Sequence, residues 1–230
     1  MAREYSLERL PLDAFGGDSL ELVLRYRGPL PPTNDRKKHV PLKHLIRQKF
    51  HSQLQYHWQH DNYLAVYFPG SKESLAQLVE ARDPARVSRA WCKCTLGKFQ
   101  FVPLVVHSPS FRLICELDIR FATRDTPGNV VNGGDLDNRI KTLFDALRMP
   151  SPGLITELPP NSEPTDTETP FLCLLEDDRL ITKFAVASER LLEAPLEGEK
   201  ESDVLLTIYA KITPNPFGTG EHNAVGSFPV

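Results

Sequence analysis

An alternation of apolar and polar side chains at 111–121 restricts the fold more than any other feature of this chain. Its apolar members are Phe111, Leu113, Cys115, Leu117, Ile119 and Phe121, and the residues between them are Arg112, Ile114, Glu116, Asp118 and Arg120. A period of two residues over this length predicts a strand with one buried face and one mostly solvated face. Residues 135–148 follow, with apolar side chains at helical spacing, and predict a helix packed on the same sheet.

Further strands and helices are predicted on both sides of this pair. The strands are expected at 18–26, 99–106, 172–175, 180–187 and 204–212, and the helices at 43–60 and 71–82. Pro103 favours an edge position for the strand at 99–106, because proline cannot donate a ladder hydrogen bond. The order of these elements predicts an α+β fold, in which a small mixed sheet is packed on one side by two main helices.

The composition is that of an ordinary globular protein. The chain has 230 residues, of which 40% are hydrophobic and 25% are charged, so collagen-like, disordered and disulfide-scaffold classes are excluded. No apolar run approaches the ~18 residues of a membrane helix. The first residues also lack the apolar core of a secretory signal. We therefore expect a cytoplasmic protein whose four cysteines are thiols.

Charge is distributed unevenly along the chain. Residues 1–148 carry 22 Lys and Arg against 16 Asp and Glu, whereas residues 149–230 carry 5 against 14. The segment 149–170 is rich in Pro, Ser, Thr and acidic residues without periodicity, so we expect a long surface loop there. Residues 213–230 are predicted to form a disordered tail.

Residues 133–141 (GGDLDNRIK) are the most informative about chemistry. Asp135 and Asp137 flank the start of the predicted helix, and Asp137, Lys141 and Asp145 share one of its faces. Two carboxylates this close repel each other, and a divalent cation that prefers oxygen ligands, Mg²⁺ or Mn²⁺, would relieve the repulsion. Alternatively, Asp135 is an N-cap, Asp137 is a first-turn acid and Lys141 is its ion-pair partner. Both interpretations fit the stretch by itself.

A second acidic cluster, Glu176-Asp177-Asp178, lies between the apolar pairs Leu174-Leu175 and Leu180-Ile181. Acidic residues between two apolar runs are typical of a turn. If this turn returns to the start of the helix at 135–148, a third carboxylate completes a metal site for phosphoryl chemistry.

Together these motifs resemble those of the RusA-type Holliday junction resolvases, a family of crossover junction endodeoxyribonucleases. The matching elements are DLDN at 135–138, a lysine four residues after the second aspartate, FDAL at 144–147 and the Asp-Asp pair at 177–178. The N-terminal part also agrees with the family pattern. It contains a predicted strand, then the segment Pro31-Pro32-Thr33-Asn34, then basic residues and a predicted helix. The resemblance covers 18–60 and 99–212. It implies one RusA-like nuclease domain at 1–212 with insertions at 61–98 and 149–170.

The resemblance also implies a Mg²⁺-dependent homodimer, with Mn²⁺ as the alternative metal, that nicks four-way DNA junctions in recombination and repair. By motif position, Asp135, Asp137 and Asp178 are the expected metal ligands, and Lys141 is the basic residue beside the scissile phosphate. Asp177 would replace Asp178 if the alignment slips by one residue. The expected DNA contacts are Arg36, Lys37, Lys38, Lys43, Arg47, Asn138 and Arg139. Their basic members fit a solvated loop and helix face equally well.

Two other functions stay open. One is a non-catalytic module with the RusA fold whose insertions recognise DNA or an unidentified protein partner, which the acidic segment 149–170 favours. The other is a different Mg²⁺ or Mn²⁺ enzyme, such as a glycosyltransferase with an Asp-x-Asp motif, but the chain lacks a nucleotide-binding parallel sheet before the motif. A zinc site from His57, His60, Cys92 and Cys94 would have Cys-x-Cys spacing in place of the usual Cys-x-x-Cys.

Overall fold

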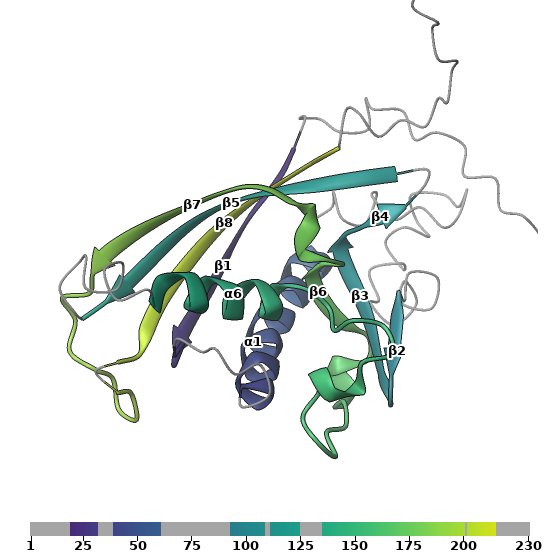
Figure 1. The fold of residues 1–230 in the computed structure, drawn as a ribbon, viewed down its shortest axis with the longest axis horizontal. Helices are drawn as coiled ribbons and strands as arrows, with labels where there is room; N and C mark the ends of the chain where they lie inside the picture. The colour runs from purple at the N-terminus through teal and green to yellow at the C-terminus, as the bar shows by residue number, and fades with distance from the viewer. Residues whose placement is uncertain are drawn as a thin grey trace, which may run out of the picture.

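The alternating segment forms strand β5 (Phe111–Thr123) inside the larger of two sheets (Figure 1). The structure is a computed structural model that describes residues 19–31, 39–60, 93–108, 111–124, 135–200 and 202–214. Within these ranges, the side chains of residues 58–60, 107, 108, 111, 112, 135 and 214 are not described. The predicted helix at 71–82 lies outside the described residues, as do most of the predicted insertion at 61–98 and of the predicted tail.

The larger sheet is mixed. β5 pairs antiparallel with β8 (Val204–Pro214) and parallel with β7 (Ile181–Arg190). β1 (Leu20–Gly28) pairs antiparallel with β8, and the short β4 (His107–Ser108) pairs antiparallel with the start of β5. The alternation is confirmed, because the inward side chains of β5 are at most 2% exposed: Leu113, Cys115, Leu117, Ile119 and Phe121. β8 continues to Pro214, so the first two residues of the predicted tail belong to a strand.

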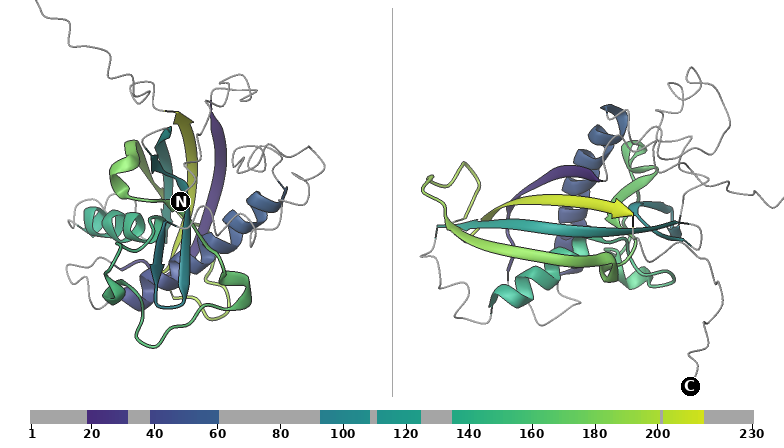
Figure 2. Two further views of the ribbon diagram at one scale, coloured as in Figure 1. Left: turned by 90° about the vertical axis from the view of Figure 1, so that its right-hand side faces the viewer. Right: turned by 90° about the horizontal axis from the view of Figure 1, so that it is seen from above.

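Two helices pack beneath one face of this sheet, α1 (Val40–His60) and α6 (Asp135–Leu147) (Figures 1 and 2). The predicted apolar stripe of α1 is buried at Ile46, Phe50 and Leu54, and that of α6 at Ile140 and Leu143. These side chains form one core with the inner face of the sheet. The predicted α+β architecture with a mixed sheet and two covering helices is therefore confirmed. Among the described helices, none has the length and apolar character needed to cross a membrane.

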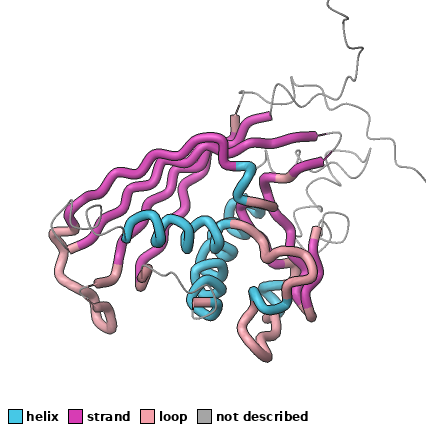
Figure 3. The backbone as a smooth tube through the Cα atoms, viewed as in Figure 1, coloured by secondary structure: helices cyan, strands magenta, loops and turns pink. Residues whose placement is uncertain are grey.

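A second, three-stranded sheet was not predicted as a separate unit (Figure 3). It contains β2 (Cys94–Leu96), β3 (Phe99–Val105) and β6 (Phe171–Leu175), with β3 in the middle. The edge position predicted for this strand is therefore wrong. Pro103 is accommodated because β2 pairs only with 99–101, so that Pro103 faces β6 alone. β2 lies inside the segment that the sequence assigned to an insertion, so residues 94–96 belong to the body of the fold.

The segment 149–170 is irregular, as predicted, but it is held against α1 and the second sheet. It contains two single-turn 3₁₀ helices, η2 (Ile155–Glu157) and η3 (Asp166–Glu168). Gln48 on α1 donates to the Glu168 carboxylate at 2.8 Å, and Met149 and Leu158 are buried among Phe99, Phe101 and Phe171. The segment is therefore part of the packed structure.

Two buried histidines of α1 attach this region. His51 Nδ1 accepts the Leu172 N–H at 2.9 Å, so Nε2 carries the proton and donates to the Thr167 carbonyl at 2.9 Å. His44 stacks on Phe171, with ring centroids 5.6 Å apart. Burial lowers the pKa of His44 to about 4, with a further contribution from Arg47, and burial also lowers the pKa of His51. Both imidazoles are therefore neutral in the folded protein near pH 7.

We predict that folding stability falls as the pH drops from 6.5 towards 4, because the unfolded chain binds protons at His44 and His51 that the folded chain excludes. His44 contributes a slope that approaches about 1.4 kcal/mol per pH unit in the middle of this window, and His51 acts in the same direction. Urea unfolding between pH 7.5 and 5 measures the free energy of unfolding. Over this range, the free energy of unfolding of the His44→Gln variant should fall by about 2 kcal/mol less than that of the wild type.

His57→Gln, a substitution of a half-exposed histidine on the same helix, is the matched control and should show the wild-type pH dependence. An unchanged pH dependence in His44→Gln would contradict the assignment.

Candidate functional site

The motif at 135–141 forms the first turns of α6, which begins at Asp135. Asp137 and Lys141 lie one turn apart on the solvent-facing side, with 70% and 68% of their side chains exposed. Lys141 Nζ lies 2.5 Å from Asp137 Oδ2. The ion pair of the simpler interpretation is therefore present. It also presents a carboxylate and an ammonium group to solvent side by side.

The Asp-Asp pair lies at the 3₁₀ turn η4 (Asp178–Leu180), between β6 and β7. Asp177 is the N-cap of this turn, since its Oδ1 accepts the Arg179 backbone N–H at 2.9 Å. The Arg179 guanidinium donates to the same carboxylate at 2.8 and 3.1 Å. The side-chain hydrogen bond from Arg179 is the main cause that lowers the pKa of Asp177 to about 2. Asp177 is therefore engaged in the cap, which favours Asp178 as the third ligand.

Asp178 lies beside α6, because η4 packs against that helix. Burial, and after it the hydrogen bond and charge of Asp177, raise the pKa of Asp178. Asp145, near the end of α6, adds to the rise, and Arg148, just after that helix, opposes it. Among the described side chains, which do not include that of Asp135, no three His, Cys, Asp or Glu are arranged to hold a metal ion.

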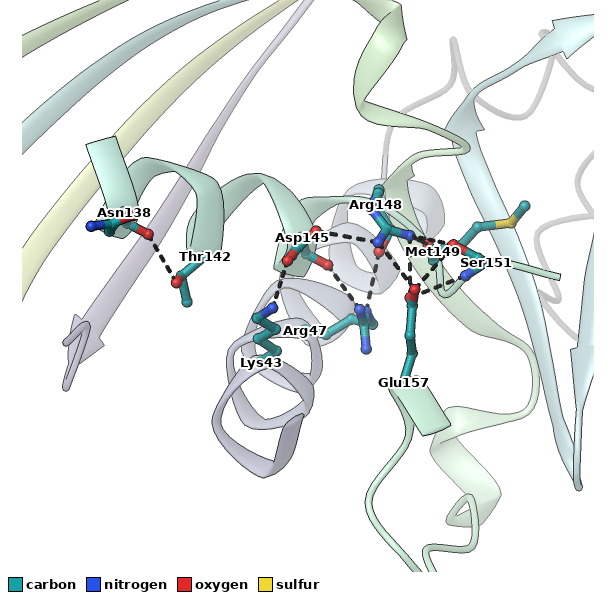
Figure 4. Close-up of polar contacts among 9 residues, drawn as sticks. All are labelled: Lys43, Arg47, Asn138, Thr142, Asp145, Arg148, Met149, Ser151 and Glu157. Carbon is teal, nitrogen blue, oxygen red and sulfur yellow. Dashed lines mark hydrogen bonds and ion pairs between the residues drawn. The ribbon is translucent and has the colours of Figure 1, made fainter. Parts of the chain in front are cut away.

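A chain of partly buried charges joins α1 to the end of α6 and to the segment 149–170 (Figure 4). Lys43 Nζ lies 2.5 Å from Asp145 Oδ2, and Arg148 Nη2 lies 3.2 Å from Asp145 Oδ1. Arg148 also donates to both carboxylate oxygens of Glu157, at 3.2 and 3.3 Å. Burial alone would raise the pKa of Asp145, but Lys43 and Arg148 hold it below its usual value. Asp145 therefore stays ionised near pH 7.

This arrangement corrects the expectation that Lys43 and Arg47 contact DNA. Arg47 is 2% exposed, and its guanidinium donates to the carbonyls of Asp145 at 2.8 Å and Arg148 at 3.2 Å. Lys43 is 9% exposed and paired with Asp145. Neither side chain faces a surface on which a phosphate could lie. Both act inside the protein, where Arg47 caps the C-terminal carbonyls of α6.

The other expected DNA contacts are partly buried or outside the described residues. The Arg139 guanidinium lies 5.9 Å from the centre of the Phe121 ring, a cation–π contact with the inner face of the sheet. The Asn138 carbonyl accepts a hydrogen bond from Thr142 at 3.0 Å, and the Asn138 side chain lies at the start of α6 (Figure 4). Their roles towards DNA stay predictions. Arg36, Lys37 and Lys38 lie outside the described residues.

Sequence reasoning missed Arg148 and Glu157. Asp145 and Arg148 are three residues apart in a helix, a spacing that favours an ion pair and was available in the sequence. Glu157 lies in an aperiodic loop, so no pattern connected it to Arg148.

The described cysteines Cys94, Cys115 and Cys173 are buried and form no disulfide, as predicted. Burial raises the pKa of Cys115 and of Cys173 to about 12, so both are neutral thiols. Cys92 and the side chain of His60 lie outside the described residues, so the zinc hypothesis stays untested.

Comparisons of the chain with protein-family models, with curated proteins and with solved structures found no match.

Asp145 and Asp177 both act on Asp178, although these three carboxylates are not arranged to hold a metal ion by themselves. Their oxygen atoms are the donors that a hard divalent cation prefers. The first two already have basic partners, whereas the raised pKa of Asp178 reflects burial and negative neighbours. A cation bound at Asp178 would offset that unfavourable charge.

We predict that Arg47→Gln lowers the free energy of unfolding by about 2–3 kcal/mol, because it removes charged hydrogen bonds from buried carbonyl oxygens. Lys49→Gln, at an exposed position on the same helix, should change it by less than about 0.5 kcal/mol. Chemical denaturation of both variants measures the difference. Equal stability of the two variants would show that Arg47 does not act as a buried cap.

Proposed function

We propose that the protein is a metal-dependent, structure-selective endodeoxyribonuclease that nicks four-way DNA junctions, as the resemblance to RusA-type resolvases implies. One observation carries the proposal. α6 presents Asp137, within the DLDN motif, and Lys141, just after it, on its exposed side, and η4 packs beside the same helix. The elements that bear the motif residues therefore adjoin one another, although more than thirty positions separate them in the sequence.

The proposed chemistry is phosphodiester hydrolysis. Asp135, Asp137 and Asp178 would hold Mg²⁺, which when bound supplies a more acidic water and positive charge beside the phosphoryl oxygens. Lys141 would neutralise charge that develops on the phosphoryl group, because its ammonium is exposed and would exchange Asp137 for a phosphate oxygen once Asp137 binds the metal. Asp177 would keep η4 in place through its cap, which orients Asp178.

The proposed assembly is a homodimer, since two sites related by a two-fold axis match the two opposing strands of a symmetric junction. Symmetric nicking follows from that geometry.

A second candidate function is a non-catalytic module with the same fold. The observation that favours it is the burial of Lys43 and Arg47, which removes two cations from the expected DNA surface. Such a module would bind its partner without any metal-dependent cleavage.

We predict that Asp137→Asn lowers junction cleavage to below about 1% of the wild-type rate, since loss of a direct ligand costs at least as much as loss of an outer-shell partner. Folding and junction binding should be retained, because Asp137 is exposed and the exposed ion pair that it makes with Lys141 contributes little to stability. The measurement is cleavage of a labelled four-way junction and a matched duplex in Mg²⁺, Mn²⁺ or EDTA.

Asp166→Asn, at an exposed acid of η3, is the matched control and should cleave like the wild type. Paired, ligatable nicks on the junction alone would support the proposal. Binding without cleavage in either metal would favour the non-catalytic module, and full turnover by Asp137→Asn at limiting Mg²⁺ would overturn the site.

A further inference from the structure

Arg179 is an exposed cation beside the candidate ligand Asp178. It follows Asp178 directly in η4, and 85% of its side chain is exposed. Lys43 and Arg47, which sequence reasoning assigned to DNA, are buried by comparison. A guanidinium in this position faces the solvent from which a substrate would approach Asp178.

The turn that carries Arg179 is anchored independently of its guanidinium. Leu180, the next residue, is 9% exposed and belongs to the main core, and η4 packs on both α6 and β5. The Asp177 cap uses the Arg179 backbone N–H, at 2.9 Å. The side chain of Arg179 can therefore move without unwinding the turn.

The ion pair between Arg179 and Asp177 is easily exchanged. Arg179 is largely exposed and Asp177 is 39% exposed. Exposed ion pairs stabilise a protein by only about 0–1 kcal/mol. A guanidinium presents parallel N–H donors that match two oxygens of either a carboxylate or a phosphate. The same fork that now holds Asp177 therefore suits a phosphodiester equally well.

We propose that Arg179 is a phosphate-binding residue, whose guanidinium leaves Asp177 and donates to a DNA phosphate at Asp178. This inference rests on the proposed nuclease function and adds a contact that the RusA-like motif does not include. Lys141 would then meet the DNA backbone from α6, and Arg179 would meet it from η4. Asp177 keeps its cap and acts as the resting partner of the guanidinium.

The test measures binding of the full chain to a four-way junction across a salt series, with Ca²⁺ in place of Mg²⁺ so that binding is followed without cleavage. Arg179→Gln should lower the slope of log K against log salt by about one and weaken binding roughly 10-fold near 0.15 M salt. Arg179→Lys should keep the slope but lose part of the affinity, since an ammonium group cannot donate as a planar fork. Asp177→Asn should bind at least as tightly as the wild type.

Lys98→Gln is the matched control. Lys98 is 70% exposed and paired with Glu163 at 2.6 Å, much as Arg179 is paired with Asp177. It lies in the turn between β2 and β3, at the far end of β3 from η4 (Figure 1). The slope of log K against log salt for Lys98→Gln should equal that of the wild type.

An unchanged slope in Arg179→Gln, with salt-dependent binding by the wild type, would overturn this inference alone. Equal losses in Arg179→Gln and Lys98→Gln would overturn it too, since a general charge effect would then suffice. No junction binding by the wild type would overturn the proposed function together with the inference.

Discussion

The ion pair between Lys43 and Asp145 joins the two helices beneath the main sheet, and the position of the candidate site depends on it. Both side chains are largely removed from water, at 11% and 24% exposure. Charges in such a place are tolerated only when they are paired and hydrogen-bonded, so the pair allows few relative positions of α1 and α6. Arg47 adds to the constraint, because its donors end on carbonyls at the C-terminus of α6. A shift of either helix would leave a buried charge or buried carbonyl groups without partners.

The same chain of charges continues into the segment that follows α6. Arg148 forms ion pairs with both Asp145 and Glu157, and Glu157 also accepts the Ser151 backbone N–H at 3.1 Å. The polypeptide then continues through η3 into β6 and η4. Gln48 and His51 attach η3 to α1. Glu157 and Glu168, two acidic residues of this segment, therefore serve internal contacts. The segment packs against α1 and the second sheet, and its backbone lies away from the start of α6 (Figure 1).

Periodic patterns in the sequence predicted the larger sheet and its helices well. The alternation at 111–121 and the four-residue spacing of Ile46, Phe50 and Leu54 report burial directly, because each period has one structural cause. The second sheet was harder to predict, since β2 has three residues and β6 is buried along its whole length without alternation. Lys43 and Arg47 show the limit most clearly. A buried cation and a surface cation are the same letter in a sequence, and only the partner from another helix distinguishes them.

The charges around η4 distinguish Asp178 from the two acidic residues nearest to it. Asp145 has Lys43 and Arg148, and Asp177 has Arg179 together with a backbone N–H, so the fold itself accounts for these two carboxylates. Within the described part of the chain, Asp178 makes no ion pair, and Arg148, whose charge favours its ionised form, already contacts Asp145 and Glu157. Asp178 is exposed to solvent, so the negative charge of its neighbours is partly screened and raises its pKa without a large cost to folding. In the proposed function, a divalent cation at Asp178 would offset the negative charge of these neighbours, which is why the proposal assigns the ligand role to this carboxylate.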